Sequence, residues 1–208
     1  VKDTMGKVEV PYDALYGAQT QRAINNFPVS GNIFSFDFIK SVVIIKRSAA
    51  IVNFKLDLLT KVQKDAIVYA ADVILDGKCN EHFPVDIFQT GSGTSTNMNV
   101  NEVIANRANE ILGSKLGSNN PVHPNDHVNM GQSSNDTIPS AINISVSLLL
   151  KDTLLPALDE LIQSLKKKEK EFKNTLKLGR THLQDATPMT LGQEFSGFKE
   201  LIIKSKKR

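Results

Sequence analysis

The sequence contains one cysteine and no tryptophan, and its charges nearly balance. Cys79 has no partner within the chain, so an internal disulfide is excluded and a reducing compartment is the simplest assumption. We interpret Cys79 as a small buried side chain. The 25 basic residues exceed the 22 acidic ones too slightly to favour binding of nucleic acid. The basic residues at 204–208 are typical of a solvated helix end.

Long apolar runs and a secretory signal are also missing. Residues 41–50 and 142–150 are the longest mainly apolar runs, but they are interrupted or bounded by charge and fall short of the ~20 residues that a transmembrane helix needs. The first residues lack the charged, apolar and small-residue order of a signal peptide. We therefore expect no membrane partner and a cytoplasmic protein, or one of the mitochondrial matrix if its source is eukaryotic.

Helical spacing of apolar residues dominates what is present. It predicts helices over residues 38–54, with Asp37 as N-cap, over 60–76 and over 97–112. Thr60 and Gln63 form a capping box, and Gly77 and Gly113 end two of these helices. Residues 138–168 form the longest helical stretch, which Pro156 bends or splits. A further helix begins near Thr190 and continues to the end of the sequence.

The predicted fold class is all-α. Val8 to Val10 alternates within residues 1–30, the one place where a small sheet is plausible. We expect an N-terminal helical domain over residues 1–130 and the start of a long-helix bundle domain, truncated, over 131–208. Residues 142–150 are apolar on more than one side, so this helix must be covered inside a bundle or at a subunit interface.

The segment GRTHLQDATPMTLGQEFSG, residues 179–197, places His182 in a polar turn that leads into a helix. Thr181, Gln184, Asp185 and Thr187 surround the imidazole with groups that can hydrogen-bond to it. Such groups can hold a histidine in one orientation and tautomer, as proton transfer requires. We therefore predict that His182 is a catalytic acid or base.

Two other segments are rich in hydroxyls and carboxamides and poor in charge. They are GSGTSTNMN at 91–99 and HPNDHVNMGQSSND at 123–136. Each precedes a predicted helix, so backbone N–H groups and hydroxyls could bind an anion there. A flexible connection explains the first segment equally simply, and helix capping explains the second. His123 and His127 stand four residues apart, but a third ligand is missing at a recognisable spacing, so we expect no metal.

The three segments, in this order, resemble the class II fumarase branch of the aspartase/fumarase superfamily. Aspartase-like enzymes typically carry Gln at the position of His182 and Thr at the position of Ser134, where this sequence has the fumarase residues. The resemblance covers essentially the whole chain. It stops before the third signature of the family, a loop of the form GSSxMPxKxN, which is absent from the sequence.

The resemblance implies the reversible hydration of fumarate to L-malate, a reaction of the tricarboxylic acid cycle. His182 would handle the proton on the hydroxyl leaving group, directly or through a water. The substrate carboxylates would be held by Ser92, Gly93, Thr94, Ser133, Ser134, Asn135 and Thr181. The family assigns the base to a serine of the absent loop. No cofactor is expected, because elimination of water moves no net electrons.

The resemblance also implies a second dicarboxylate site and a homotetramer. The second site would comprise His123, Pro124, Asn125 and Asp126, although this chain has Asn120 where family members can have an arginine. Each active site would take its segments from three subunits. Without the missing loop, the 208 residues alone are expected to be inactive. The alternatives are a non-catalytic helical assembly fragment and another superfamily lyase, such as aspartate ammonia-lyase.

Overall fold

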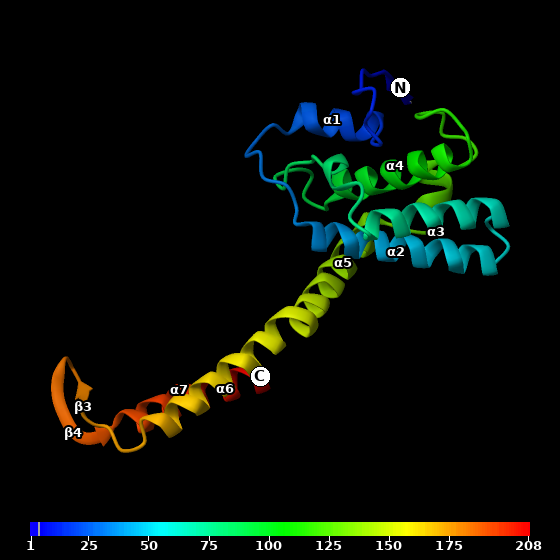
Figure 1. The fold of residues 1–208 in the computed structure, drawn as a ribbon. Helices are drawn as coiled ribbons and strands as arrows, with labels where there is room; N and C mark the ends of the chain where they lie inside the picture. Colours follow the sequence, from blue (N-terminus) through cyan, green and yellow to red (C-terminus); the bar gives the residue numbers. More distant parts are fainter. Residues whose placement is uncertain (4) are drawn as a thin grey trace. The chain divides into compact units, whose positions relative to one another are not determined.

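The computed structural model describes residues 1–3 and 5–208. The chain divides into two compact units, Val1–Ser145 and Val146–Arg208, and each is described by itself. Seven α-helices make up most of the described residues, with two small antiparallel sheets (Figure 1). The predicted helical fold class is confirmed. The two units divide between Ser145 and Val146, within a helix. The sequence predicted a domain boundary between residues 130 and 131, and that division into domains remains a prediction.

Helices packed around one apolar core form the first unit. They are α1 (Ala18–Asn26), α2 (Phe36–Lys55), α3 (Lys61–Leu75), α4 (Thr94–Ile111), α5 (Ser134–Leu149) and the short turns η1 (Asn80–His82) and η2 (Pro124–Val128). Helix α3 packs against both α2 and α4, and α1 lies on α4 (Figure 1). Cys79 is buried in the same core, as expected, and burial raises the pKa of its thiol.

Local capping explains where α2 and α3 begin. The Thr60 hydroxyl accepts a hydrogen bond from the Gln63 N–H, and the Gln63 side chain accepts one from the Thr60 N–H, so the predicted capping box is confirmed. The prediction that Asp37 caps α2 is wrong. Ser35 is the N-cap. Asp37 lies in the first turn, where its negative charge interacts favourably with the positive end of the helix dipole.

Helix α1 is attached to α4 through one buried carboxylate. The side chain of Glu102 accepts hydrogen bonds from the backbone N–H groups of Gly17 (2.8 Å), Gln19 (2.9 Å) and Thr20 (3.0 Å). The Thr20 hydroxyl donates a fourth bond, at 2.6 Å. A Cβ at Gly17 would lie 2.8 Å from the Glu102 carboxylate, so only glycine permits this approach. Glu102 thus satisfies the free N–H groups at the start of α1.

The small sheets differ from the prediction. Strand β1 (Lys2–Asp3) pairs with β2 (Gly6–Lys7), so the first sheet precedes the alternating residues Val8 to Val10. Strands β3 (Leu176–Thr181) and β4 (Gln184–Thr190) form a second sheet. The expectation that a sheet is plausible only within residues 1–30 is therefore wrong. Its turn, His182 and Leu183, lacks the Gly or Asn that usually indicates a hairpin.

The second unit is a helical hairpin that carries this sheet. Helix α6 (Leu155–Glu171) packs against α7 (Leu191–Lys207), with the rings of Phe172 and Phe195 stacked 5.8 Å apart. A capping box of Thr190 and Gln193 begins α7. A π-helical turn, η3 (Leu150–Leu154), immediately precedes α6. Pro156 has no N–H to donate to the preceding turn, so the predicted interruption of the long helix occurs here.

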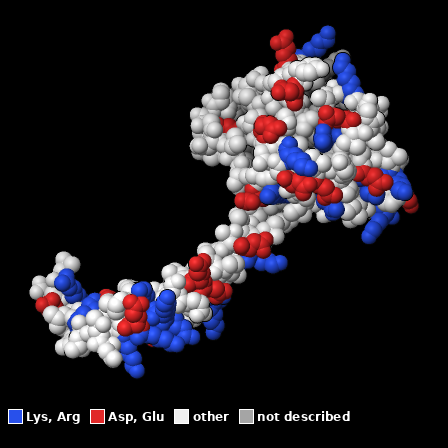
Figure 2. All heavy atoms as spheres, viewed as in Figure 1, with Lys and Arg blue, Asp and Glu red and all other residues white. Residues whose placement is uncertain are grey.

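The helical segment Ser134–Glu171 passes a length and hydropathy test for a membrane span, although the sequence runs had predicted no such helix. The test is weak, since apolar core helices of soluble proteins also pass it. This segment exposes Ile142, Val146, Leu148, Leu149, Leu150, Leu154 and Leu161. Residues 137–150 of this segment carry no charged side chain, and Figure 2 shows a white stretch along it. These apolar side chains require a cover that the chain itself does not provide within the described residues.

Asp86 joins the loop after α1 to the segment before α4. Its carboxylate accepts hydrogen bonds from the N–H groups of Phe88 (2.8 Å), Ser30 (2.7 Å) and Gly31 (2.7 Å). These bonds, with that of Phe88 contributing most, lower the pKa of Asp86 from 3.8 to about 2 in spite of burial. Since the folded-state pKa lies below the unfolded value, the carboxylate stabilises the fold above pH ~4, and this contribution disappears as pH falls towards 2.

We expect Asp86→Asn to lower the thermal midpoint at neutral pH and to flatten the loss of stability between about pH 4 and pH 2. Unfolding followed by circular dichroism across this range measures both effects. Asp76→Asn, at an exposed helix end, is the control and should retain the wild-type pH dependence. An unchanged acid profile in Asp86→Asn would show that the Asp86 carboxylate does not hold the loop.

Candidate functional site

Hydroxyl groups from two predicted binding segments meet in the first unit. The Ser92 and Thr94 hydroxyls lie 2.8 Å apart, and Thr94 Oγ1 lies 3.1 Å from Ser134 Oγ. Thr94 is the first residue of α4 and Ser134 the first of α5, so two helix N-termini meet at this contact. Helix N-termini present free N–H groups and partial positive charge, which favour a bound anion. The fold therefore brings hydroxyls and helix N-termini from distant parts of the chain together, an arrangement that suits a bound anion.

Ser133 and Asn135 flank Ser134 at the same helix end. The Asn135 N–H donates to Ser133 Oγ at 3.2 Å, and the Ser133 carbonyl accepts from the N–H groups of Asp136 and Thr137. Ser133 thus acts as a helix cap, the alternative that the sequence left open. The side chain of Asn135 is exposed and free to donate its amide to a ligand. Capping and ligand binding are compatible here because they use different side chains.

Gly93 gives this segment its shape. Its φ of +67° lies in the left-handed region, which glycine adopts without the steric strain of a side chain. A Cβ at this position would also lie 3.0 Å from Ile138 Cγ1 on α5. Gly93 therefore permits both the turn before α4 and the close approach of α5.

Thr181 and His182 belong to the second unit. Thr181 ends β3 and pairs with Gln184, which leaves His182 and Leu183 as a two-residue turn. Both have positive φ, 51° and 62°, as in a type I′ hairpin. His182 is exposed, and its ring makes no hydrogen bond within the described residues, so the predicted support from neighbouring side chains is not found there. The hairpin backbone places this residue at the tip of the turn.

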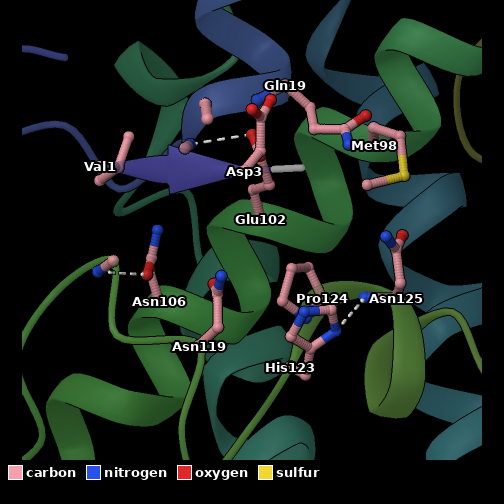
Figure 3. Close-up of a pocket in the computed structure, with 13 residues that line it drawn as sticks. Val1, Asp3, Gln19, Met98, Glu102, Asn106, Asn119, His123, Pro124 and Asn125 are labelled. Atoms are coloured by element: carbon pink, nitrogen blue, oxygen red, sulfur yellow. Dashed lines mark hydrogen bonds between the residues drawn. The ribbon is translucent and has the colours of Figure 1, made fainter. Parts of the chain in front are cut away.

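The predicted second site lines a cavity of about 170 Å³ in the first unit (Figure 3). His123, Pro124 and Asn125 meet the start of α1 there. The His123 ring is the N-cap of η2, with Nδ1 accepting from the N–H groups of Asn125 and Asp126, each at 3.2 Å. Asp126 is not among the described lining residues, which include the carboxylates of Asp3 and Glu102 and no Lys or Arg.

The two histidines of this segment have separate structural roles. His127 Nδ1 accepts a hydrogen bond from the His123 N–H at 2.8 Å, and its Nε2 faces the Gln63 amide nitrogen at 3.1 Å. Burial lowers the pKa of His127, the Asp126 carboxylate opposes this shift, and the charge of His123 adds a smaller lowering. In a protonated His127, both ring nitrogens would carry a hydrogen and would face the His123 N–H and the Gln63 amide nitrogen, so the geometry favours the neutral form. The described residues contain no group of three or more side chains that could hold a metal ion.

The sequence reasoning missed two buried charged side chains near these segments. They are Glu102, which holds the start of α1, and Lys46, which lies within the core on α2. Ionic residues within an apolar helix pattern usually lie on its exposed face. A lysine with apolar neighbours at three- and four-residue spacing on both sides, as in SVVIIKRSAAIV, was the available signal.

Comparison with known proteins identifies the family of this chain. The protein family described as lyase matches residues 6–208, and the chain belongs to this family. Within it, the chain is 53% identical over 196 residues to a class II fumarate hydratase of Bradyrhizobium diazoefficiens, covering 94% of this chain and 41% of that protein. It is also 53% identical to the mitochondrial fumarate hydratase of Schizosaccharomyces pombe, over 94% and 38% of the two chains.

A solved structure shows the same fold. The recombinant class II fumarase of Schistosoma mansoni superposes with a TM-score of 0.95 at 45% identity, covering 100% of this chain and 44% of that one. The chain thus spans less than half the length of these relatives. The fold and the family follow from this match.

Gly93→Ala tests whether this glycine shapes the binding segment. An alanine with positive φ is strained by about 1–2 kcal/mol, and its Cβ would press on Ile138, so we expect a lower thermal midpoint and weaker dicarboxylate binding. Gly91→Ala is a matched control two residues away, since a Cβ there meets no atom within 4 Å. Differential scanning fluorimetry and calorimetric titration measure the two effects. Equal behaviour of both variants would contradict the role of Gly93.

Proposed function

We propose that the full-length protein containing this chain is a fumarate hydratase, which converts fumarate and L-malate reversibly in the tricarboxylic acid cycle. The main supporting observation is the contact between Thr94 and Ser134, which joins two helix N-termini into an anion site. Relatives at about half sequence identity are named fumarate hydratase. The fumarase residues at His182 and Ser134, in place of Gln and Thr, favour this activity over an aspartate ammonia-lyase.

The proposed reaction requires an oriented anion site. In the direction from malate, removal of a carbon-bound proton beside a carboxylate spreads negative charge into that carboxylate. Thr94, Ser134, Asn135 and the adjacent N–H groups would bind a substrate carboxylate and stabilise this charge, with Ser92, Gly93, Ser133 and Thr181 completing the set. His182 would donate a proton to the leaving hydroxyl, directly or through a water. The base and a cationic side chain would come from segments outside these 208 residues.

A homotetramer would cover the apolar surface of the long helical segment. Helices from four subunits would form a central bundle around side chains such as Ile142, Val146 and Leu149, which are exposed in the single chain. Such a bundle would let each active site combine the first unit of one subunit with the His182 hairpin of another. The reaction needs no cofactor. The protein would act in the cytoplasm or, in a eukaryote, the mitochondrial matrix.

His182→Asn in the full-length protein should lower kcat for fumarate hydration by about 10²-fold or more, because general acid–base assistance contributes ~10²–10⁴. Circular dichroism and gel filtration should match the wild type, since the His182 side chain is exposed and does not support the hairpin. A pure, folded variant with the wild-type turnover would show that the proton moves through another group.

Asn135→Ala should lower kcat/KM for fumarate by a factor equivalent to about 3–4 kcal/mol of transition-state stabilisation, as for loss of one preorganised donor. His123→Asn is the comparison, and its effect should be far smaller. The cavity at His123 does not include the hydroxyl cluster, which consists of Ser92, Thr94 and Ser134. Steady-state kinetics of both variants measure the difference. A larger defect in His123→Asn would reverse the assignment of the two sites.

A further inference from the structure

Lys46 is a buried cation without an anionic partner among the described residues. It lies in the middle of α2 with an exposed fraction of 0%, and its Nζ donates to Asn129 Oδ1 at 2.8 Å. Burial alone lowers the pKa of Lys46 from 10.5 to about 7, and no neighbouring carboxylate, histidine or cation contributes to the shift. A buried ammonium group without an anion nearby destabilises the folded chain. Stability therefore does not explain why Lys46 lies in the core.

Asn129 connects Lys46 to both halves of the hydroxyl cluster. Its Oδ1 accepts a second hydrogen bond, from Asn97 Nδ2, at 3.1 Å. Its Nδ2 donates to the carbonyl oxygen of Gln132 at 3.0 Å. Asn97 lies one helical turn after Thr94, and its N–H bonds to the Gly93 carbonyl. A single carboxamide thus links α2 to α4 and to the loop that precedes α5.

The same loop is held at further points. Asn53, also on α2, donates to the Met130 carbonyl at 3.2 Å, and Gln132 Nε2 donates to the Val128 carbonyl at 2.9 Å. Gln132 is followed directly by Ser133 and Ser134. The backbone before α5 is therefore fixed by side chains of α2 and by its own amides, and Lys46 is the one charged member of the group.

We propose that Lys46 is a positioning residue of the anion site, which holds the starts of α4 and α5 together through Asn129 and supports a bound dicarboxylate dianion with its ammonium charge. This inference rests on the proposed function. The low dielectric around Lys46 leaves its charge little screened, so the field extends to the helix ends on the other side of Asn129. A bound dianion in turn favours the protonated amine.

Binding should therefore be coupled to protonation of Lys46. Near neutral pH the amine is partly deprotonated in the free protein, and the dianion draws a proton onto it. Affinity for a dicarboxylate should fall as pH rises through about 7. In contrast, stability of the free protein should rise with pH from about 7 to 10.5, because the unfolded chain then binds more protons than the folded one.

The test uses succinate, a dicarboxylate that cannot be hydrated, and the full-length protein. Isothermal titration between about pH 6 and pH 9 should show wild-type affinity decreasing and proton uptake on binding. Lys46→Met retains the apolar length of the side chain but should bind succinate about tenfold more weakly at pH 6, the equivalent of one pKa unit, and should lack the pH step. Lys55→Met, at the exposed end of α2, is the matched control and should bind as the wild type does.

Two further measurements separate Lys46 from other titrating groups and from a purely structural role. The pH step should persist in His182→Asn, which removes the imidazole of the proposed active site. Lysine Nζ resonances in the wild-type protein should show a pKa for Lys46 that rises when succinate binds, a readout that needs no variant to fold. An unchanged Lys46 pKa on binding, or a folded Lys46→Met with wild-type affinity and pH dependence, would overturn the inference.

The proposed function fails separately from this inference. If the wild-type protein neither hydrates fumarate nor binds succinate, both the function and the role of Lys46 are wrong. If it does both, and the pH dependence of binding is the same in wild type and Lys46→Met, only the role of Lys46 is wrong.

Discussion

The burial of α4 on nearly all sides is the constraint on which the first unit depends. Apolar side chains such as Val100, Val103 and Ile104 fill its contacts with neighbouring helices. Four of its buried polar side chains hold the backbone of other segments: Asn99 donates to His82, Asn106 to Leu15, Asn109 to Val122, and Glu102 accepts from residues 17–20. Because an unpaired buried amide is unfavourable, these bonds specify one arrangement of the loops.

The contact between Thr94 and Ser134 is a consequence of this arrangement. Helix α4 begins at Thr94, and the loop that leads into α5 is held against α4 by Asn129, so two helix N-termini and three hydroxyls converge. The buried charge of Lys46 lies behind the same carboxamide. One residue thus serves both the core and the hydroxyl contact. Asn129 bonds to the buried side chains of Lys46 and Asn97, and it also holds the loop that leads to Ser134.

In the second unit, His182 lies at the tip of a hairpin and not between packed helices. Two consecutive residues with positive φ form a tight turn between paired strands, and the histidine is presented to solvent at its tip. Left-handed backbone at non-glycine residues is strained, and such strain is often found at functional positions, where surrounding structure maintains it. The strand pairing on both sides supplies that support here. The hairpin can therefore present His182 in one direction without hydrogen bonds to its ring.

The sequence by itself determined the features that depend on neighbouring residues. The capping boxes at Thr60 and Thr190, the glycine stop after α3 and the interruption at Pro156 each involve residues within one or two helical turns, so local pattern was sufficient. Resemblance to a known family predicted that the polar segments bind the substrate. Only the tertiary structure decided the β3–β4 hairpin, whose turn carries no usual sequence signal. The burial of Lys46 and the meeting of Thr94 with Ser134 also depend on packing between distant helices, which local pattern does not encode.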